Sequence, residues 1–209
     1  MQVNLKDDLL QAKGYDGRTA WERAPLSSNK EILDTQWDWS KEVQVNLKHD
    51  LLLDNGYDGV TAWYRTALIS NKEILETLWD WGREMQVNLK DHLLLAKGYD
   101  GLTAWDMGSS KSNKEILETL WVWYRRVQVN VKDDLLLAKG YDRQSSWVRA
   151  ASKGNKEIIE TLWCWGREVQ VNLKDDLLLP KGYDGITAWD RAACKGIKEI
   201  LGTLCFLVE

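Results

Sequence analysis

Hydrophobic and polar positions alternate with a helical period in the segment from Asn71 to Val87. Placed at about 100° per residue, its apolar side chains fall within about 160° of one another, and its charged side chains occupy the rest. The apolar positions are Ile74, Leu75, Leu78, Trp79, Trp81, Gly82 and Met85. A stripe this wide predicts a helix packed between two neighbours.

A second pattern, GYDGVTAW, precedes this helix at residues 56–63. Its Asp-Gly pair favours a tight turn, because glycine accepts a positive φ without steric cost. Threonines then fit as N-caps of a short helix, and acidic residues three positions further on complete a capping box. The threonines are Thr19, Thr61, Thr103 and Thr187, and the acidic residues are Glu22, Asp106 and Asp190.

Both patterns recur along the chain with a period of 42 residues, marked by Trp21, Trp63, Trp105, Trp147 and Trp189. We therefore expect a single repeat domain over 1–209, made of five repeats: 1–42, 43–84, 85–126, 127–168 and 169–209. A repeat this short cannot bury a core alone, so neighbouring repeats must stack. The expected fold class is all-α, a repeat solenoid in which each repeat has a helix pair and a short extra helix.

Local departures refine this plan. Pro25 should end the short helix of the first repeat early. Arg143 replaces the second turn glycine in the fourth repeat, which predicts a strained turn or one of a different type. The segment that reads VQVNLKDDLLL at 169–179 recurs with small changes in every repeat and predicts the short extra helix. It offers an asparagine cap in each repeat, at Asn4, Asn46, Asn88, Asn130 and Asn172. A strand stays open there, because short apolar runs do not distinguish the two.

Composition removes several classes of function. The net charge is -4 and the pI about 5.4, whereas nucleic-acid binders usually carry a basic excess. No apolar run is long enough for a membrane span. The first residues lack the regions of a signal peptide, and the three cysteines occupy unrelated positions of the repeat. We expect reduced cysteines and a cytoplasmic location.

No set of residues suggests catalysis. His49 and His92 stand at different repeat positions, so they form no row of metal ligands. Paired carboxylates such as Asp133 and Asp134 suit helix capping better than acid–base chemistry, which needs unlike environments. The 13 tryptophans keep three places in the repeat and are read as core. We therefore expect no enzyme, no catalytic residue, no metal and no cofactor.

Taken together, D-G-x-T-A-W, a small residue, G-N-K-E-I-x-x-x-L and V-N resemble the ankyrin repeat, as in DGITAWDRAACKGIKEILGTL of the fifth repeat. The resemblance covers all five repeats. The period departs from the family's length of about 33 residues. Ala-Trp also replaces the family's Pro-Leu, and its histidine is absent. HEAT and armadillo repeats have a nearer period but lack the Asp-Gly turn followed by a threonine cap.

The resemblance implies a protein-binding face, concave and formed by the turns and first helices. Positions that vary between the repeats collect there: Arg18, Glu22, Val60, Tyr64, Leu102, Asp106, Met107, Gln144, Val148, Ile186 and Asp190. Tyr64, Met107 and Val148 are thereby expected to be apolar surface positions. Drift at unconstrained surface sites would give the same variation.

The leading expectation is a protein–protein interaction module without catalysis. The alternative is a structural spacer, a self-associating array or an engineered scaffold without a specific natural partner. Gln11, Gln36 and Ser40 suggest a polar cap on the first repeat, whereas the last repeat is more apolar and could self-associate.

Overall fold

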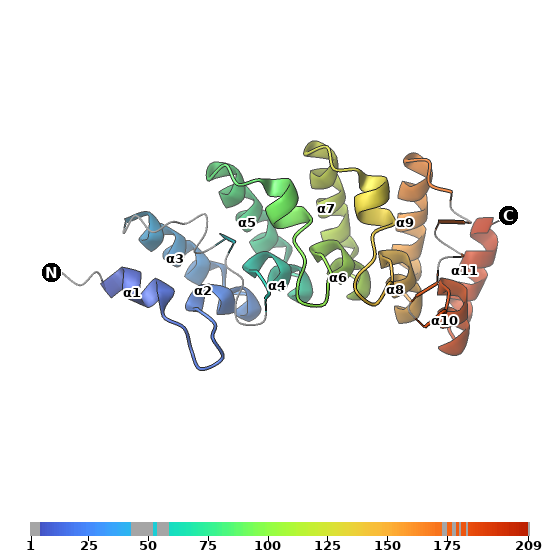
Figure 1. The fold of residues 1–209 in the computed structure, drawn as a ribbon, viewed down its shortest axis with the longest axis horizontal. Coiled ribbons are helices and arrows are strands. Elements are labelled where there is room, and N and C mark those ends of the chain that lie inside the picture. The colour runs from blue at the N-terminus through green and yellow to red at the C-terminus, as the bar shows by residue number, and fades with distance from the viewer. Residues whose placement is uncertain are drawn as a thin grey trace. The chain divides into compact units, whose positions relative to one another are not determined.

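The computed structural model describes residues 5–42, 52–53, 59–172, 175–176, 179, 181–182 and 184–208. In these ranges every regular element is a helix, apart from one isolated bridge between Lys13 and Thr19. The expectation of an all-α chain is confirmed. The chain divides into two compact units, Met1–Tyr99 and Asp100–Glu209 (Figure 1).

The N-terminal unit contains α1 (Leu5–Gln11), α2 (Ala20–Arg23), η1 (Pro25–Ser27), α3 (Lys30–Glu42), α4 (Ala62–Ile69), α5 (Lys72–Glu84) and η3 (Lys90–Leu94). Helix α1 packs on α3, and α4 packs on α2, η1 and α5. As expected, Pro25 ends the regular part of α2, and a 3-10 turn follows it.

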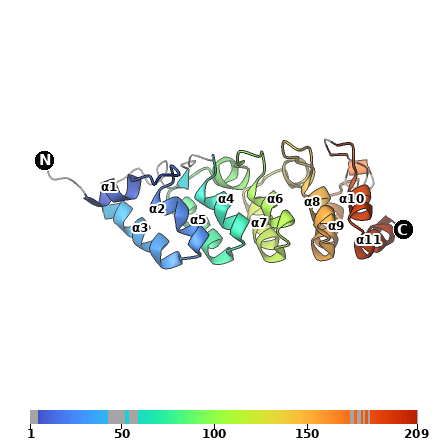
Figure 2. The same ribbon diagram turned by 90° about the horizontal axis from the view of Figure 1, so that it is seen from below.

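The C-terminal unit contains α6 (Ala104–Ser110), α7 (Lys114–Arg126), η4 (Val131–Leu136), α8 (Ser146–Lys153), α9 (Lys156–Glu168), α10 (Ala188–Cys194) and α11 (Lys198–Val208). The short helices α6, α8 and α10 pack side by side in one layer. The long helices α7, α9 and α11 form the layer beneath them (Figure 2). Each short helix packs on the long helix that follows it.

Side chains cap the helices where the sequence predicts. Thr19, Thr61, Thr103 and Thr187 each accept a hydrogen bond from the backbone three residues on. Glu22, Asp106 and Asp190 complete their capping boxes. Ser145 takes the N-cap position in the fourth repeat but makes no such side-chain bond. Asparagine side chains cap the long helices α5, α7 and α9, as Asn71 does for α5.

The extra element is helical where the structure describes it, so the strand alternative is wrong there. In α1 it is an α-helix, whereas η3 and η4 are π-helices. Asn88 and Asp91 bond reciprocally, and Asn130 and Asp133 do the same. The predicted caps at Asn4 and Asn46 lie outside the described residues.

Tryptophans form the centre of the core. Trp21, Trp63, Trp105 and Trp147 are each 1% exposed, whereas Trp189 is 41% exposed. The ring of Trp37 stacks on that of Trp81 at 4.4 Å and 8°, and Trp121 stacks on Trp165 at 4.6 Å and 8°. The same junction is therefore built in both units. A small residue stands three positions after the first tryptophan of each repeat. At one of these positions, Gly108, an added Cβ would lie 3.0 Å from Leu117 Cδ2.

The expectation of a polar cap on the first repeat changes. Gln36 and Ser40 are buried, and the Ser40 hydroxyl donates to the carbonyl of Trp37 at 2.6 Å. A polar end surface therefore does not include them, although Gln11 is exposed.

The three cysteines are free and exposed. Among the described residues, no helix is both long and apolar enough to cross a membrane.

Replacing Trp105 by alanine should lower the free energy of unfolding by about 3–5 kcal/mol, because a buried ring leaves a cavity. Trp189→Ala at the equivalent position of the last repeat should cost clearly less, since that ring is already partly in water. Urea denaturation of the two variants measures the difference. Equal losses would contradict the assignment of Trp105 to the core.

Candidate functional site: the turn-tip surface

Each described turn is closed by an aspartate that bonds its own backbone. The carboxylates of Asp16, Asp100, Asp142 and Asp184 accept the backbone N–H two residues further on, at 3.0–3.2 Å. The glycine after the aspartate has a φ of 66–74°. Such turns are short and leave the tyrosine before the aspartate outside the fold.

Arg143 adopts the same left-handed conformation, with a φ of 57°. Its N–H donates to the carbonyl of Gly140 at 2.9 Å, as Gly17 does to Gly14. The fourth turn is therefore of the same type as the others, and the expectation of a different type is wrong. A non-glycine residue at this φ stores backbone strain, which agrees with the other alternative.

The tyrosines of these turns are the most exposed aromatic side chains among the described residues. Tyr15 is 110% exposed, and Tyr99 and Tyr141 are each 72% exposed. The ring of Tyr141 lies over Gly101, where an added Cβ would approach its Cδ1 to 2.6 Å. The backbone N–H of Tyr141 also donates to the carbonyl of Asp100 at 3.4 Å. We call the exposed rings at the turns of each unit its turn-tip surface: Tyr15 and Tyr99 in the N-terminal unit, and Tyr141 in the C-terminal unit.

Sequence reasoning missed these tyrosines because they are the same in every repeat and were read as part of the turn that precedes the short helix. Their exposure could have been inferred from the turn itself. An aromatic residue before a tight Asp-Gly turn has no neighbouring strand or helix to cover it. The constant residue is thus the accessible one.

Most of the variable positions, by contrast, lie inside the fold. Buried are Glu22, Val60, Tyr64, Leu102, Asp106, Met107 and Val148; half-buried are Arg18, Gln144 and Ile186; exposed is Asp190. The expectation that Tyr64, Met107 and Val148 are surface positions is therefore wrong. The short helices pack against one another, so a side chain there faces the next repeat instead of solvent.

In two repeats of the C-terminal unit, the residue before the N-cap also faces the next repeat. Leu102 lies against Gly140 of the following turn, and Gln144 approaches Gly182 in the same way. In the N-terminal unit Val60 is buried at the equivalent position. Variation there reflects how two turns fit together, and it leaves the turn-tip surface as the accessible part of the expected face.

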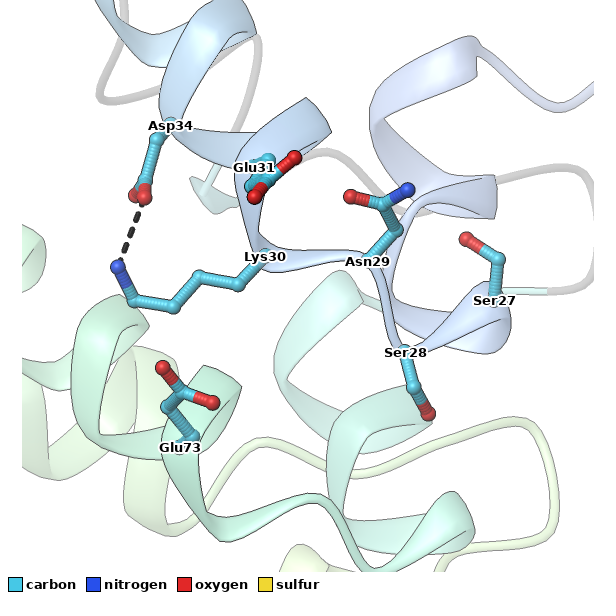
Figure 3. Close-up of a pocket in the computed structure, with 7 residues that line it drawn as sticks. All are labelled: Ser27, Ser28, Asn29, Lys30, Glu31, Asp34 and Glu73. Atoms are coloured by element: carbon cyan, nitrogen blue, oxygen red, sulfur yellow. Dashed lines mark hydrogen bonds and ion pairs between the residues drawn. The ribbon is translucent and has the colours of Figure 1, made fainter.

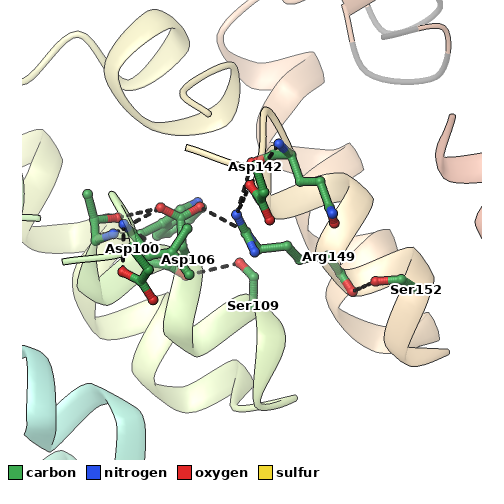
Figure 4. A network of polar contacts seen from close by, with 10 residues as sticks. Asp100, Asp106, Ser109, Asp142, Arg149 and Ser152 are labelled. Atoms are coloured by element: carbon green, nitrogen blue, oxygen red, sulfur yellow. Dashed lines mark hydrogen bonds and ion pairs between the residues drawn. The ribbon is translucent and has the colours of Figure 1, made fainter. Parts of the chain in front are cut away.

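A polar network lies beneath these turns in the C-terminal unit (Figure 4). Arg149 donates to the carboxylate of Asp142 at 2.5 Å, and its Nε lies 3.9 Å from Asp106. The backbone N–H and hydroxyl of Thr103 both donate to Asp106 at 3.0 Å. In the N-terminal unit Arg65 approaches Glu22 at 3.9 Å, with both side chains almost fully buried. Glu22 and Asp106 thus serve internal contacts.

The two capping carboxyls Asp106 and Asp190 have pKa values shifted in opposite directions, because Asp106 is buried and Asp190 is exposed. At Asp106, burial raises the carboxyl pKa, although the bonds from Thr103 and the charge of Arg149 oppose it. At exposed Asp190, the same bonds from Thr187 lower the pKa. The phenol pKa of Tyr124 is raised well above its usual value, first by burial and then by the charge of Asp106.

The N-terminal unit also holds an open polar cavity of about 520 Å³. It is lined by Ser27, Ser28, Asn29, Lys30, Glu31, Asp34 and Glu73 (Figure 3). Lys30 donates to Asp34 at 2.7 Å, and this bond raises the pKa of its ammonium group. An amine held protonated is not a nucleophile. Among the described residues, no group of three His, Cys, Asp or Glu side chains could hold a metal ion.

No protein-family model matches this sequence, and no curated protein matches it significantly.

The opposite pKa shifts of Asp106 and Asp190 allow a test of how stability depends on pH. Asp106 has a raised pKa in the folded protein, so between its usual pKa and this higher value the folded state binds more protons than the unfolded state. Its contribution to stability should therefore increase as the pH falls through that window. We expect the difference in unfolding free energy between the wild type and Asp106→Asn to change in this direction, measured by urea denaturation at pH 3–7.

Asp190→Asn is the matched control with the opposite sign. Its folded pKa is lowered, so its stabilising effect is present at neutral pH and is lost as the pH falls through the folded pKa. The same pH trend in both variants would contradict the role assigned to burial.

Proposed function

We propose that this protein is a non-catalytic protein-binding module in which partners contact the turn-tip surface of each unit. The observation that carries the proposal is the exposure of Tyr15, Tyr99 and Tyr141 on short, internally bonded turns. Tyrosine is enriched among the residues that dominate binding energy, because its ring offers large contact area and its hydroxyl offers a hydrogen bond.

The rigidity of the turns supports binding as the role of these side chains. Each turn is closed by its aspartate and by backbone bonds such as that from Gly14 to the carbonyl of Arg18, at 2.8 Å. A ring mounted on an ordered turn loses little conformational freedom on binding.

The proposal includes the architecture expected from the sequence. We infer an ankyrin-like solenoid with a long 42-residue repeat, in which turns project from a stack of helix pairs. Helix-pair packing within each unit and the threonine caps support this reading. A cytoplasmic location is part of the same proposal and rests on the sequence alone.

Substitution of the tyrosines tests the function. A partner captured from a lysate of the source cells is purified, and its affinity for the wild type is measured by calorimetry. Tyr15→Ser and Tyr141→Ser should each weaken binding about tenfold or more, because each removes an aromatic anchor. Tyr141→Phe should retain more affinity than Tyr141→Ser, since the ring remains.

Val122→Ser serves as the matched control, because Val122 is an apolar residue of α7 that is 46% exposed. It should bind the partner as the wild type does. Unchanged affinity in both serine variants of the tyrosines, with unchanged urea denaturation curves, would exclude the turn-tip surface as the binding site.

A further inference from the structure

One contact between neighbouring repeats joins tryptophans. Trp21 lies 5.6 Å from Trp81 of the following repeat, and Trp105 lies 5.5 Å from Trp165 of the following repeat. The covering ring is the last of the three tryptophans in its repeat. In these two repeats the first tryptophan is therefore buried with help from the repeat that follows.

Charged pairs join the same neighbours. The capping carboxylate of one repeat approaches an arginine of the next, as Glu22 does Arg65 and Asp106 does Arg149. On the long helices, Lys114 donates to Glu157 of the next repeat at 3.0 Å. In the first kind of pair the following repeat supplies the cation, whereas in the second it supplies the anion. The two faces of a repeat therefore carry different patterns of charge.

The turns make a further contact. Tyr141 covers Gly101 of the preceding turn, and Tyr99 lies beside Gly59, where an added Cβ would be 3.8 Å away. Glycine permits this approach because it has no side chain of its own.

The last repeat presents the same groups without a cover. Trp189 is 41% exposed, and both Asp190 and Lys198 are exposed. Around Gly185 an added Cβ would meet nothing within 4 Å. These residues occupy the repeat positions of Trp105, Asp106, Lys114 and Gly101. We call Gly185, Trp189, Asp190 and Lys198 the C-terminal face.

The first repeat presents the groups that would cover them. Tyr15, Arg23 and Glu31 are exposed, and Trp39 is half-buried. Arg23 bonds Asp16 of its own turn, as Arg149 bonds Asp142, so its guanidinium is already held near the turn. We call Tyr15, Arg23, Glu31 and Trp39 the N-terminal face. Its charges are complementary to the C-terminal face: Arg23 to Asp190, and Glu31 to Lys198.

We propose that the C-terminal face binds the N-terminal face of a second copy of this chain, head to tail. The contact continues the junction between repeats: Trp39 covers Trp189, Arg23 approaches Asp190, Glu31 bonds Lys198 and Tyr15 covers Gly185. Because the two faces differ, the contact is heterologous and permits open-ended assembly. One ion pair is not carried over, since Glu209 stands at the position of Arg125 in the sequence.

Sedimentation velocity of the full chain tests the proposal from about 1 μM to about 1 mM, a range that brackets contacts of modest affinity. The average mass should rise with concentration and pass that of a dimer, and high salt should weaken the association. Arg23→Glu and Asp190→Lys should each weaken it about tenfold, because each places like charges together. The double variant, with both charges exchanged, should regain most of the wild-type association.

Control measurements separate the proposed contact from other causes. Asp190→Lys removes a helix cap, so circular dichroism checks that α-helix content is retained, and Trp189→Ser tests the same face without a change of charge. Val122→Ser should associate as the wild type does. A chain that keeps the mass of one copy over the whole range overturns the proposal. So does an assembly that stops at a dimer and ignores Arg23→Glu, because it would join two C-terminal faces.

Discussion

The structure depends on tryptophans that two neighbouring repeats bury together. The indole of Trp105 is covered by Trp121 and Tyr124 of its own repeat and by Trp165 of the next. Burial of such rings supplies much of the favourable free energy of a small core. Stability in this chain is therefore a property of junctions, and a repeat is held in place chiefly by its neighbours.

The junctions also determine which residues remain available to other molecules. Short helices that pack side by side hide the side chains of their first turns, including Tyr64 and Val148. The turns extend beyond this packing and keep their tyrosines in solvent. In the described turns, aspartates and left-handed glycines close the backbone, so the accessible residues sit on turns that are held by their own hydrogen bonds.

The sequence predicted the elements whose causes are local. The Thr103–Asp106 capping box, the early end of α2 at Pro25 and the long α5 helix each follow from residues within one turn or one helix face. It failed where the cause lies in the next repeat. The position of Met107 varies between repeats as a surface residue would, yet Met107 is buried, because α6 packs against α8 of the next repeat. The constant Tyr141 was overlooked for the converse reason. The π-helical winding of η3 and η4 has no signal that we can identify in the sequence.

Near-identical repeats carry a risk during folding, because a chain can pair one repeat with the wrong copy. The buried acid–arginine contact opposes this error in the N-terminal unit. Were the second repeat skipped, Glu22 would meet Met107 in place of Arg65, and a buried carboxylate would lose its cation. An unpaired charge of this kind costs several kcal/mol, on the order of 3–5. The few positions that differ between the copies thus favour pairing of each repeat with its neighbour in sequence over pairing with another copy.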